Sequence, residues 1–182
     1  MTDTQKKPLW KNELVWLFLL TSGLFAILYS KFILGGYAYV FTDTGADTMQ
    51  INYAQYGLFS SLFRSGESGY VLQAGLGMDV SSYYPAYLIP YNLLILLAPQ
   101  RLLPWAVLAS AYLKMITISL VGYLFYRKLM QDGIGTMAAA LAWTFSGYVI
   151  LWGQHYGFCT CMALFTVFMY FLQCYLLSLI HI

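Results

Sequence analysis

The sequence contains few charged residues. Asp, Glu, Lys and Arg make up 9% of its 182 residues, against roughly 25% in an ordinary soluble domain. Hydrophobic residues make up 60% and aromatic residues 19%, so the polar side chains are too few to cover the surface of a water-soluble fold. The composition excludes a soluble domain and predicts a membrane protein.

Excess charge of one sign and cysteine are also scarce. The net charge of +2 is too small to indicate nucleic acid as a partner. The three cysteines, Cys159, Cys161 and Cys174, fall in one apolar run. Side chains two residues apart on a helix point to opposite sides, so Cys159 and Cys161 make a poor metal pair and are interpreted as small buried packing residues.

The first apolar run, residues 13–34, is long enough to form a transmembrane helix with Lys31 at its headgroup end. Lys6, Lys7 and Lys11 precede this run, which places the N-terminus in the cytoplasm. The run lacks a convincing cleavage site between small residues and more membrane segments follow it. We therefore interpret it as a retained signal anchor and not as a cleaved signal peptide.

Residues 35–84 contain several glycines and acidic residues, a composition typical of a long folded loop outside the membrane. Apolar residues recur in this loop at helical spacing and predict an amphipathic helix that lies along the membrane surface and ends near Gly66. The apolar stripe consists of Met49, Tyr53, Tyr56, Phe59 and Phe63, and the opposite face of Gln50, Ala54, Gly57 and Ser61.

The remaining runs complete the predicted topology. Residues 85–103 are short for a span and broken by Pro90, so they predict an interfacial or re-entrant segment. Residues 104–126 form a second span that Arg127 and Lys128 anchor in the cytoplasm. Residues 134–152 and 158–180 form the third and fourth spans and leave the outer turn "QHYG" between them. The prediction is an all-α fold, a single polytopic transmembrane helical bundle over residues 1–182.

Two carboxylates, Asp43 and Asp47, stand in "FTDTGADTMQ" at the start of the outer loop. Asp47 precedes the predicted surface helix, where a carboxylate acts as an N-cap. A cap does not explain the second aspartate. Two carboxylates on a glycine-containing turn can bind a divalent cation, or one can act as a general base and the other orient it. The spacing does not choose between these roles.

Other candidate residues share the predicted outer side or lie within a span. Gln154 and His155 form an outer turn, where hydrogen-bonded residues of an interfacial aromatic belt are the ordinary interpretation. Tyr83 and Tyr84 fit the same belt, or a platform that packs on sugar rings. Lys114 lies about ten residues into a span, so we expect it to face the protein interior or a wet cavity. With Arg101 at the outer interface, it is a candidate to bind a lipid phosphate, the alternative being a structural partner.

Several stretches, in this order, resemble the N-terminal part of YfhO-like bacterial membrane proteins, which are glycosyltransferases of the GT-C type. They are "YVFTDTGADTMQINYAQY", "GLGMD" with "YYP", "LLILLAP", "LPWAVLASAYLKM" and "FSGYVILWGQHYGF". The similarity runs from about residue 36 to residue 168. It implies a GT-C-like bundle in the bacterial cytoplasmic membrane.

The resemblance also implies an activity. Such enzymes transfer a sugar from a polyprenyl phosphate carrier to an acceptor outside the membrane, such as a teichoic acid or another envelope polymer. Their acidic catalytic residue lies in the first outer loop, so the catalytic candidates here are Asp43 and Asp47. The substrate-binding candidates are Gln154, His155, Tyr83, Tyr84, Arg101 and Lys114. A divalent metal is possible as a cofactor, although the sequence contains no clear ligand cluster.

The chain departs from the family in length, because family members are several times longer. We therefore expect an N-terminal fragment that is inactive alone, and the ending "LLSLIHI" resembles translated adapter sequence. Two other functions stay open, a lipid or polymer transporter subunit without bond chemistry and a non-catalytic membrane scaffold.

Overall fold

The computed structural model describes residues 12–41, 47–67, 69–72, 77–81, 88–130 and 132–180. These residues are mostly helical and include one short antiparallel hairpin. The elements are α1 Glu13–Leu28, α2 Ser30–Leu34, the π-helix η2 Thr48–Tyr53, α3 Ala54–Ser65, β1 Tyr70–Val71, β2 Met78–Asp79, the 3-10 helix η3 Pro90–Asn92, α5 Leu93–Leu97, the 3-10 helix η4 Gln100–Leu102, α6 Leu103–Arg127, α7 Gly133–Thr144, α8 Gly147–Trp152 and α9 Tyr156–Ile180.

Three helical segments are long and apolar enough to cross a membrane. They are Gln100–Arg127, the α7–α8 segment Gly133–Trp152, and Tyr156–Leu179, while α1 is a shorter apolar helix. Large apolar side chains on these helices are exposed on the outside of the bundle, where hydrocarbon is the only favourable solvent for them. The chain is therefore a helical membrane protein.

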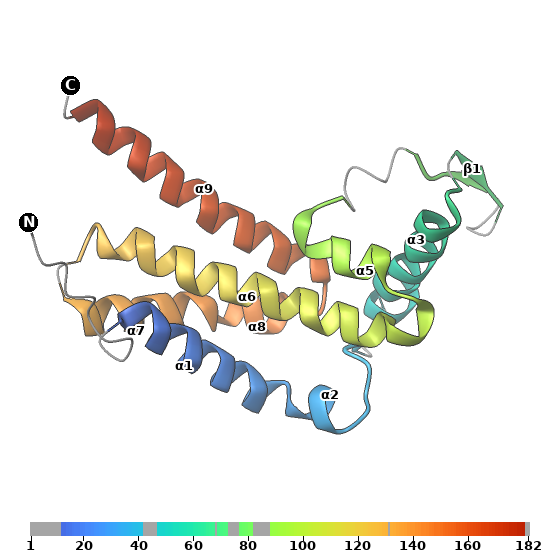
Figure 1. The fold of residues 1–182 in the computed structure, drawn as a ribbon, viewed down its shortest axis with the longest axis horizontal. Helices are drawn as coiled ribbons and strands as arrows, with labels where there is room; N and C mark the ends of the chain where they lie inside the picture. The colour runs from blue at the N-terminus through green and yellow to red at the C-terminus, as the bar shows by residue number, and fades with distance from the viewer. Residues whose placement is uncertain are drawn as a thin grey trace, which may run out of the picture.

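Helix α6 lies in the middle of the bundle, with α1 and α7 along one side and α9 on the other (Figure 1). Small and polar residues let the helices approach closely here. The buried Thr21 hydroxyl of α1 hydrogen bonds with the buried Ser119 hydroxyl of α6 at 2.7 Å, and Ser22 pairs with the Tyr112 hydroxyl at 2.8 Å. Such contacts between membrane helices replace the hydrophobic effect, which is weak inside a bilayer.

Helix α3 lies at one end of the molecule and packs against α5 (Figure 1). The π-helix η2 directly precedes α3. Helix α3 ends at Gly66, which adopts the left-handed conformation with φ 72°. The buried residues of α3 are Tyr56, Phe59, Ser60 and Leu62. Met49 and Phe63 of the predicted apolar stripe are exposed instead. The buried face of the helix therefore contacts protein, and it is rotated from the stripe that the sequence predicts.

Two hydrogen bonds fix α3 on its neighbours. The buried Ser60 hydroxyl donates to the Ala98 carbonyl at 2.6 Å, and Gln100 Nε2 donates to the Gly57 carbonyl at 2.6 Å. Helix α5 has only five residues, between Pro90 in the turn before it and Pro99 after it. This helix is too short to cross a bilayer, since a span needs about 20 residues.

The segment predicted as one span over residues 134–152 consists of two helices. Helix α7 ends at Thr144, and Ser146 precedes α8 with extended backbone at φ −61° and ψ 155°. Asp132 caps the start of α7 by accepting hydrogen bonds from the Ile134 and Gly135 amides. Helices α7 and α8 are therefore separate helices, and α8 leads into the turn before α9.

Candidate functional site

Asp47 directly precedes the π-helix η2. Its backbone already has helical dihedral angles, φ −58° and ψ −38°, and its side chain makes no capping hydrogen bond. Its backbone carbonyl accepts a hydrogen bond from Asn52 Nδ2 at 3.2 Å. Helix capping therefore does not explain this half-buried aspartate. The second carboxylate, Asp43, lies outside the described residues.

The start of η2 is tied to the turn between α8 and α9. Thr48 is fully buried, and its hydroxyl donates to the Gln154 backbone carbonyl at 3.3 Å. The segment that contains Asp47 thus contacts the segment that contains Gln154, although the two are more than 100 positions apart in the sequence. The structure brings together one catalytic candidate and the "QHYG" turn.

His155 is held in this turn by aromatic neighbours. Its ring lies 5.7 Å from the Trp152 ring and 5.7 Å from the Phe158 ring, the second at 89°. Its backbone amide donates to the Trp152 carbonyl at 3.0 Å. His155 is half-buried, and these two rings hold its imidazole in place. A side chain held in this way is well placed to hydrogen bond a substrate.

Beneath the turn lies a cluster of buried tyrosines, Tyr29, Tyr39, Tyr56 and Tyr156. The Tyr56 and Tyr156 rings stack at 5.3 Å and 15°, and the Tyr156 hydroxyl donates to the Tyr39 carbonyl. The Tyr56 hydroxyl donates to Asn92 Oδ1 at 3.3 Å. This cluster connects α3, η3, α9 and the residues after α2, and we refer to these four tyrosines as the tyrosine floor of the turn.

Burial raises the pKa of the Tyr39 hydroxyl far above its ordinary value. This phenol therefore stays protonated at any physiological pH. It can pack and donate a hydrogen bond but cannot act as a base. Near the outer turn, Asp47 and His155 are two groups whose chemistry suits proton transfer.

Lys114 lies on the buried face of α6, only 2% exposed. Its Nζ donates to the Tyr156 carbonyl at 3.2 Å, and the Thr160 hydroxyl donates to the same carbonyl at 3.1 Å. One helical turn earlier, the buried Ser110 hydroxyl has no hydrogen-bond partner within the described part of the chain. The ammonium group is therefore a buried cation directly under the turn that carries Gln154 and His155.

Arg101 occupies a different place. It lies in η4, is exposed, and precedes α6. Leu103 and Lys114 are 11 positions apart on α6, which is about 17 Å along the helix axis. Arg101 and Lys114 are therefore separate candidates and not two halves of one phosphate site. The other predicted aromatic platform, Tyr83 and Tyr84, lies outside the described residues.

The described residues include no group of three or more His, Cys, Asp or Glu that could hold a metal ion. Cys159 is buried and Cys161 is exposed, which agrees with the opposite directions expected from their spacing. The prediction that both are buried packing residues is therefore wrong for Cys161, because its face of α9 points away from the bundle. Asp43 lies outside the described residues, so a metal shared by the two aspartates is not tested by this geometry.

The tyrosine floor was not foreseen from the sequence. Tyr39 and Tyr156 are separated by 117 positions, and their pairing depends on how the segments after α2 and before α9 meet. The number of tyrosines, 17 among 182 residues, is the one signal that points to such a cluster, because tyrosine combines a large apolar ring with a polar group that needs a partner.

Comparisons with protein-family models, with curated proteins and with solved structures found no match to this chain.

Proposed function

We propose that this chain forms the outer pocket of an integral membrane glycosyltransferase of the GT-C type, related to YfhO-like proteins. The enzyme would transfer a sugar from a polyprenyl-phosphate carrier to an envelope polymer such as a teichoic acid, outside the bacterial cytoplasmic membrane. Two kinds of support combine in this proposal, the ordered sequence stretches that resemble the family and the geometry around Asp47.

The observation that supports the proposal best is the Thr48–Gln154 hydrogen bond. It holds the residue that follows Asp47 against the turn that carries Gln154 and His155. A glycosyltransferase needs such an arrangement, because the base must meet the acceptor hydroxyl while other groups position the sugar.

In the proposed reaction, the Asp47 or Asp43 carboxylate accepts the proton of an acceptor hydroxyl. The hydroxyl oxygen attacks the anomeric carbon from the face opposite the phosphate, and the bond between that carbon and the phosphate oxygen breaks. The electron pair of this bond stays on the leaving carrier phosphate. Gln154 and His155 hydrogen bond the sugar or the acceptor, and Tyr83 and Tyr84 pack on sugar rings.

A cation must offset the charge that grows on the leaving phosphate. Lys114 suits this role because it is buried beneath the turn, where electrostatic interactions are stronger than in water. Arg101 is the alternative, at the headgroup level. Because Arg101 precedes α6 and Lys114 lies in its middle, the two are far apart, and only one of them is expected to contact the reacting phosphate.

The test replaces each aspartate by asparagine in the full-length protein, which keeps the shape of the side chain and removes its basicity. We expect transfer of labelled sugar from the carrier lipid to fall by about 10²–10⁴-fold when the base is removed. Transfer at near wild-type rates in both the Asp47→Asn and the Asp43→Asn variant would contradict the proposed base. Gln55→Glu, a charge change on α3, is the control for general effects of charge on this loop.

The same preparation separates the other two functions. A lipid or polymer transporter would move labelled carrier lipid across reconstituted bilayers without sugar transfer. A membrane scaffold would do neither, and the aspartate variants would change only thermal stability.

A further inference from the structure

Helices α6 and α9 enclose a groove at the end of the molecule opposite α3. They meet near the start of α9 and separate toward its C-terminal end (Figure 1). A pocket of about 80 Å³ lies between α6, α7 and α9, and an adjoining hollow of about 310 Å³ continues toward the ends of α6 and α9. Phe125 and Met169 line both, so the two form consecutive parts of one groove.

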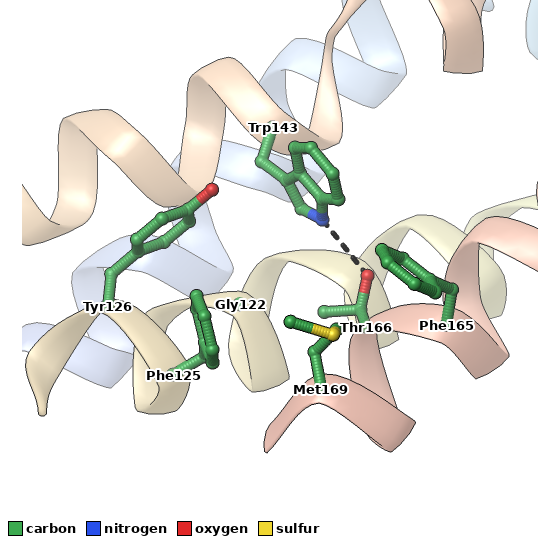
Figure 2. A pocket seen from close by; sticks show the side chains of 7 residues that line it. All are labelled: Gly122, Phe125, Tyr126, Trp143, Phe165, Thr166 and Met169. Carbon is green, nitrogen blue, oxygen red and sulfur yellow. Dashed lines mark hydrogen bonds between the residues drawn. The ribbon is translucent and has the colours of Figure 1, made fainter. Parts of the chain in front are cut away.

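The inner part of the groove is lined mostly by apolar atoms, with the Tyr126 hydroxyl at its edge (Figure 2). Figure 2 shows Trp143 and Thr166 pointing toward each other across the pocket. Trp143 Nε1 donates to the Thr166 hydroxyl at 3.0 Å, and that hydroxyl donates to the Met162 carbonyl at 2.8 Å. These polar atoms already have hydrogen-bond partners, so a polar ligand would be buried here without partners of its own. An acyl chain has no polar group to desolvate, and its entry into the pocket therefore costs the least free energy.

The outer part of the groove is mostly apolar and carries two polar side chains, Lys128 and Gln173. Lys128 lines it, and its Nζ lies 5.1 Å from the centre of the Tyr170 ring and 2.9 Å from Cys174 Sγ. The Gln173 Oε1 atom, also in the lining, is buried and accepts no hydrogen bond from the described part of the chain. The lining of this end therefore includes one cation, Lys128, and one acceptor, Gln173 Oε1, that accepts no hydrogen bond within the described residues.

Two described carboxylates at this end of the bundle have other partners. Glu13 accepts a hydrogen bond from the Tyr123 hydroxyl, and Asp132 caps α7. Lys128 thus keeps its charge available for an anion from outside the protein. The contact with Cys174 raises the pKa of Lys128, so the ammonium stays charged at neutral pH.

The distances fit one phospholipid. Gly122 and Lys128 are six positions apart, about 9 Å along the helix axis, and half of the hydrocarbon core is about 15 Å thick. A headgroup at Lys128 therefore places the upper part of an acyl chain at the level of the apolar pocket.

We propose that this groove binds one anionic phospholipid whose headgroup carries a hydroxyl group, such as phosphatidylglycerol. Its phosphate accepts from Lys128, its headgroup hydroxyl donates to Gln173 Oε1, and one acyl chain enters the pocket beside Trp143 and Gly122. On the predicted topology this lipid belongs to the cytoplasmic leaflet. The site is separate from the outer pocket and does not depend on the proposed sugar transfer.

The test is native mass spectrometry of the purified protein in a mild detergent, titrated with dioleoyl phosphatidylglycerol or with dioleoyl phosphatidylcholine. We expect one phosphatidylglycerol to remain bound in preference to phosphatidylcholine, whose choline group donates no hydrogen bond. Lys128→Gln is expected to weaken phosphatidylglycerol binding about fivefold, the effect of removing one lysine from an anionic lipid surface. Lys31→Gln, the same change on exposed α2, is expected to leave binding unchanged.

A second variant tests the acyl-chain pocket. A methyl group on Gly122 would meet Trp143 Cδ1 at 3.6 Å and Thr166 Cγ2 at 3.8 Å, which are ordinary contacts. Gly122→Ala is therefore expected to fold normally, to narrow the pocket and to weaken the binding of both lipids. An unchanged thermal midpoint shows that folding is intact.

Three results would overturn the proposal. The first is equal binding of the two lipids with no effect of Lys128→Gln. The second is full competition by the soluble headgroup glycerophosphoglycerol, because the acyl chain would then contribute nothing. The third is a lipid-free dimer, which would show that a second copy of the chain fills the groove.

Discussion

The two ends of the bundle are held together in different ways. At the end that carries α3, hydrogen bonds join segments far apart in the sequence, from Thr48 to Gln154, Ser60 to Ala98, Gln100 to Gly57, Lys114 to Tyr156 and Tyr156 to Tyr39. At the opposite end, α9 separates from α6 (Figure 1), and its side chains are largely exposed, with Phe171 at 64% and Tyr175 at 61%.

Under the proposed function, the difference bears on which end can hold reacting groups in place. A reacting site must hold its groups within a fraction of an ångström, and this requires side chains locked by packing and hydrogen bonds. The α3 end has that support for Gln154, His155 and Lys114. The α9 end instead offers a mostly apolar groove with Lys128 in its lining, which suits a lipid that is bound but not transformed.

After the loss of the proposed base, the largest expected effect concerns Lys114 and the rate of transfer. Under the proposed function, Lys114→Met is expected to lower kcat for sugar transfer by about 10²–10³-fold, since a fixed charge that stabilises the transition state is lost. Thermal stability should not fall, because a lysine within a membrane span is costly and the Thr160 hydroxyl still donates to the Tyr156 carbonyl. Lys31→Met is the control. A stability loss with unchanged kcat would make Lys114 a structural residue only.

The next effect compares the two glycines that flank the outer turn. A methyl group on Gly153 would lie 2.5 Å from the Val149 carbonyl oxygen, a backbone atom that cannot move easily, so Gly153→Ala should destabilise the protein by about 2 kcal/mol. On Gly157 it would meet nothing within 4 Å. Gly157→Ala should therefore stabilise α9 by about 0.5 kcal/mol. Thermal unfolding in detergent measures both, and equal midpoints would contradict the described turn.

A smaller effect is expected at the contact between η2 and the turn. Thr48→Val removes the donor to the Gln154 carbonyl in a fully buried position, at a cost of about 1 kcal/mol. The matched control is Thr117→Val, because the Thr117 hydroxyl only bonds to its own helix at the Leu113 carbonyl. Comparable midpoints for the two variants would show that the outer loop is not fixed by Thr48.

The smallest effect is expected in the middle of the bundle. Thr21→Val breaks the hydrogen bond with Ser119 between α1 and α6. Hydrogen bonds between membrane helices contribute about 0.6 kcal/mol on average, so the thermal midpoint should shift only slightly. If Thr21→Val lowered the thermal midpoint more than Thr48→Val does, the middle of the bundle would depend more on its hydrogen bond than the α3 end does, which would contradict the comparison.

Much of the helical organisation can be predicted from the sequence. The expected span 104–126 lies within α6, Leu103–Arg127, because an uninterrupted apolar run between proline and a basic pair leaves little choice of boundary. The break between α7 and α8 is less visible, since Phe145 and Ser146 continue an apolar run and only the serine before a glycine marks a new helix start.

The face of α3 was harder to predict for a physical reason. The expected stripe was extended at the α-helical period from Met49 onward, but residues 48–53 form a π-helix, whose turns contain more residues. The wider turns put Met49 out of phase with α3, in which Tyr56 and Phe59 of the expected stripe are buried. Phe63, near the end of α3, is exposed while its neighbour Leu62 is buried. The tyrosine floor and the lipid groove depend on contacts between distant segments, which the local pattern does not contain.

The central claim is that the turn beside Asp47 lies outside the membrane while the end of α6 lies in the cytoplasm. It is tested by labelling single-cysteine variants, Asp47→Cys and Lys128→Cys, in a protein whose Cys159, Cys161 and Cys174 are replaced by serine. In intact cells, a membrane-impermeant maleimide should label position 47, and position 128 should react only after permeabilisation. Labelling of position 128 from outside, with position 47 protected until the cells are opened, would contradict the account.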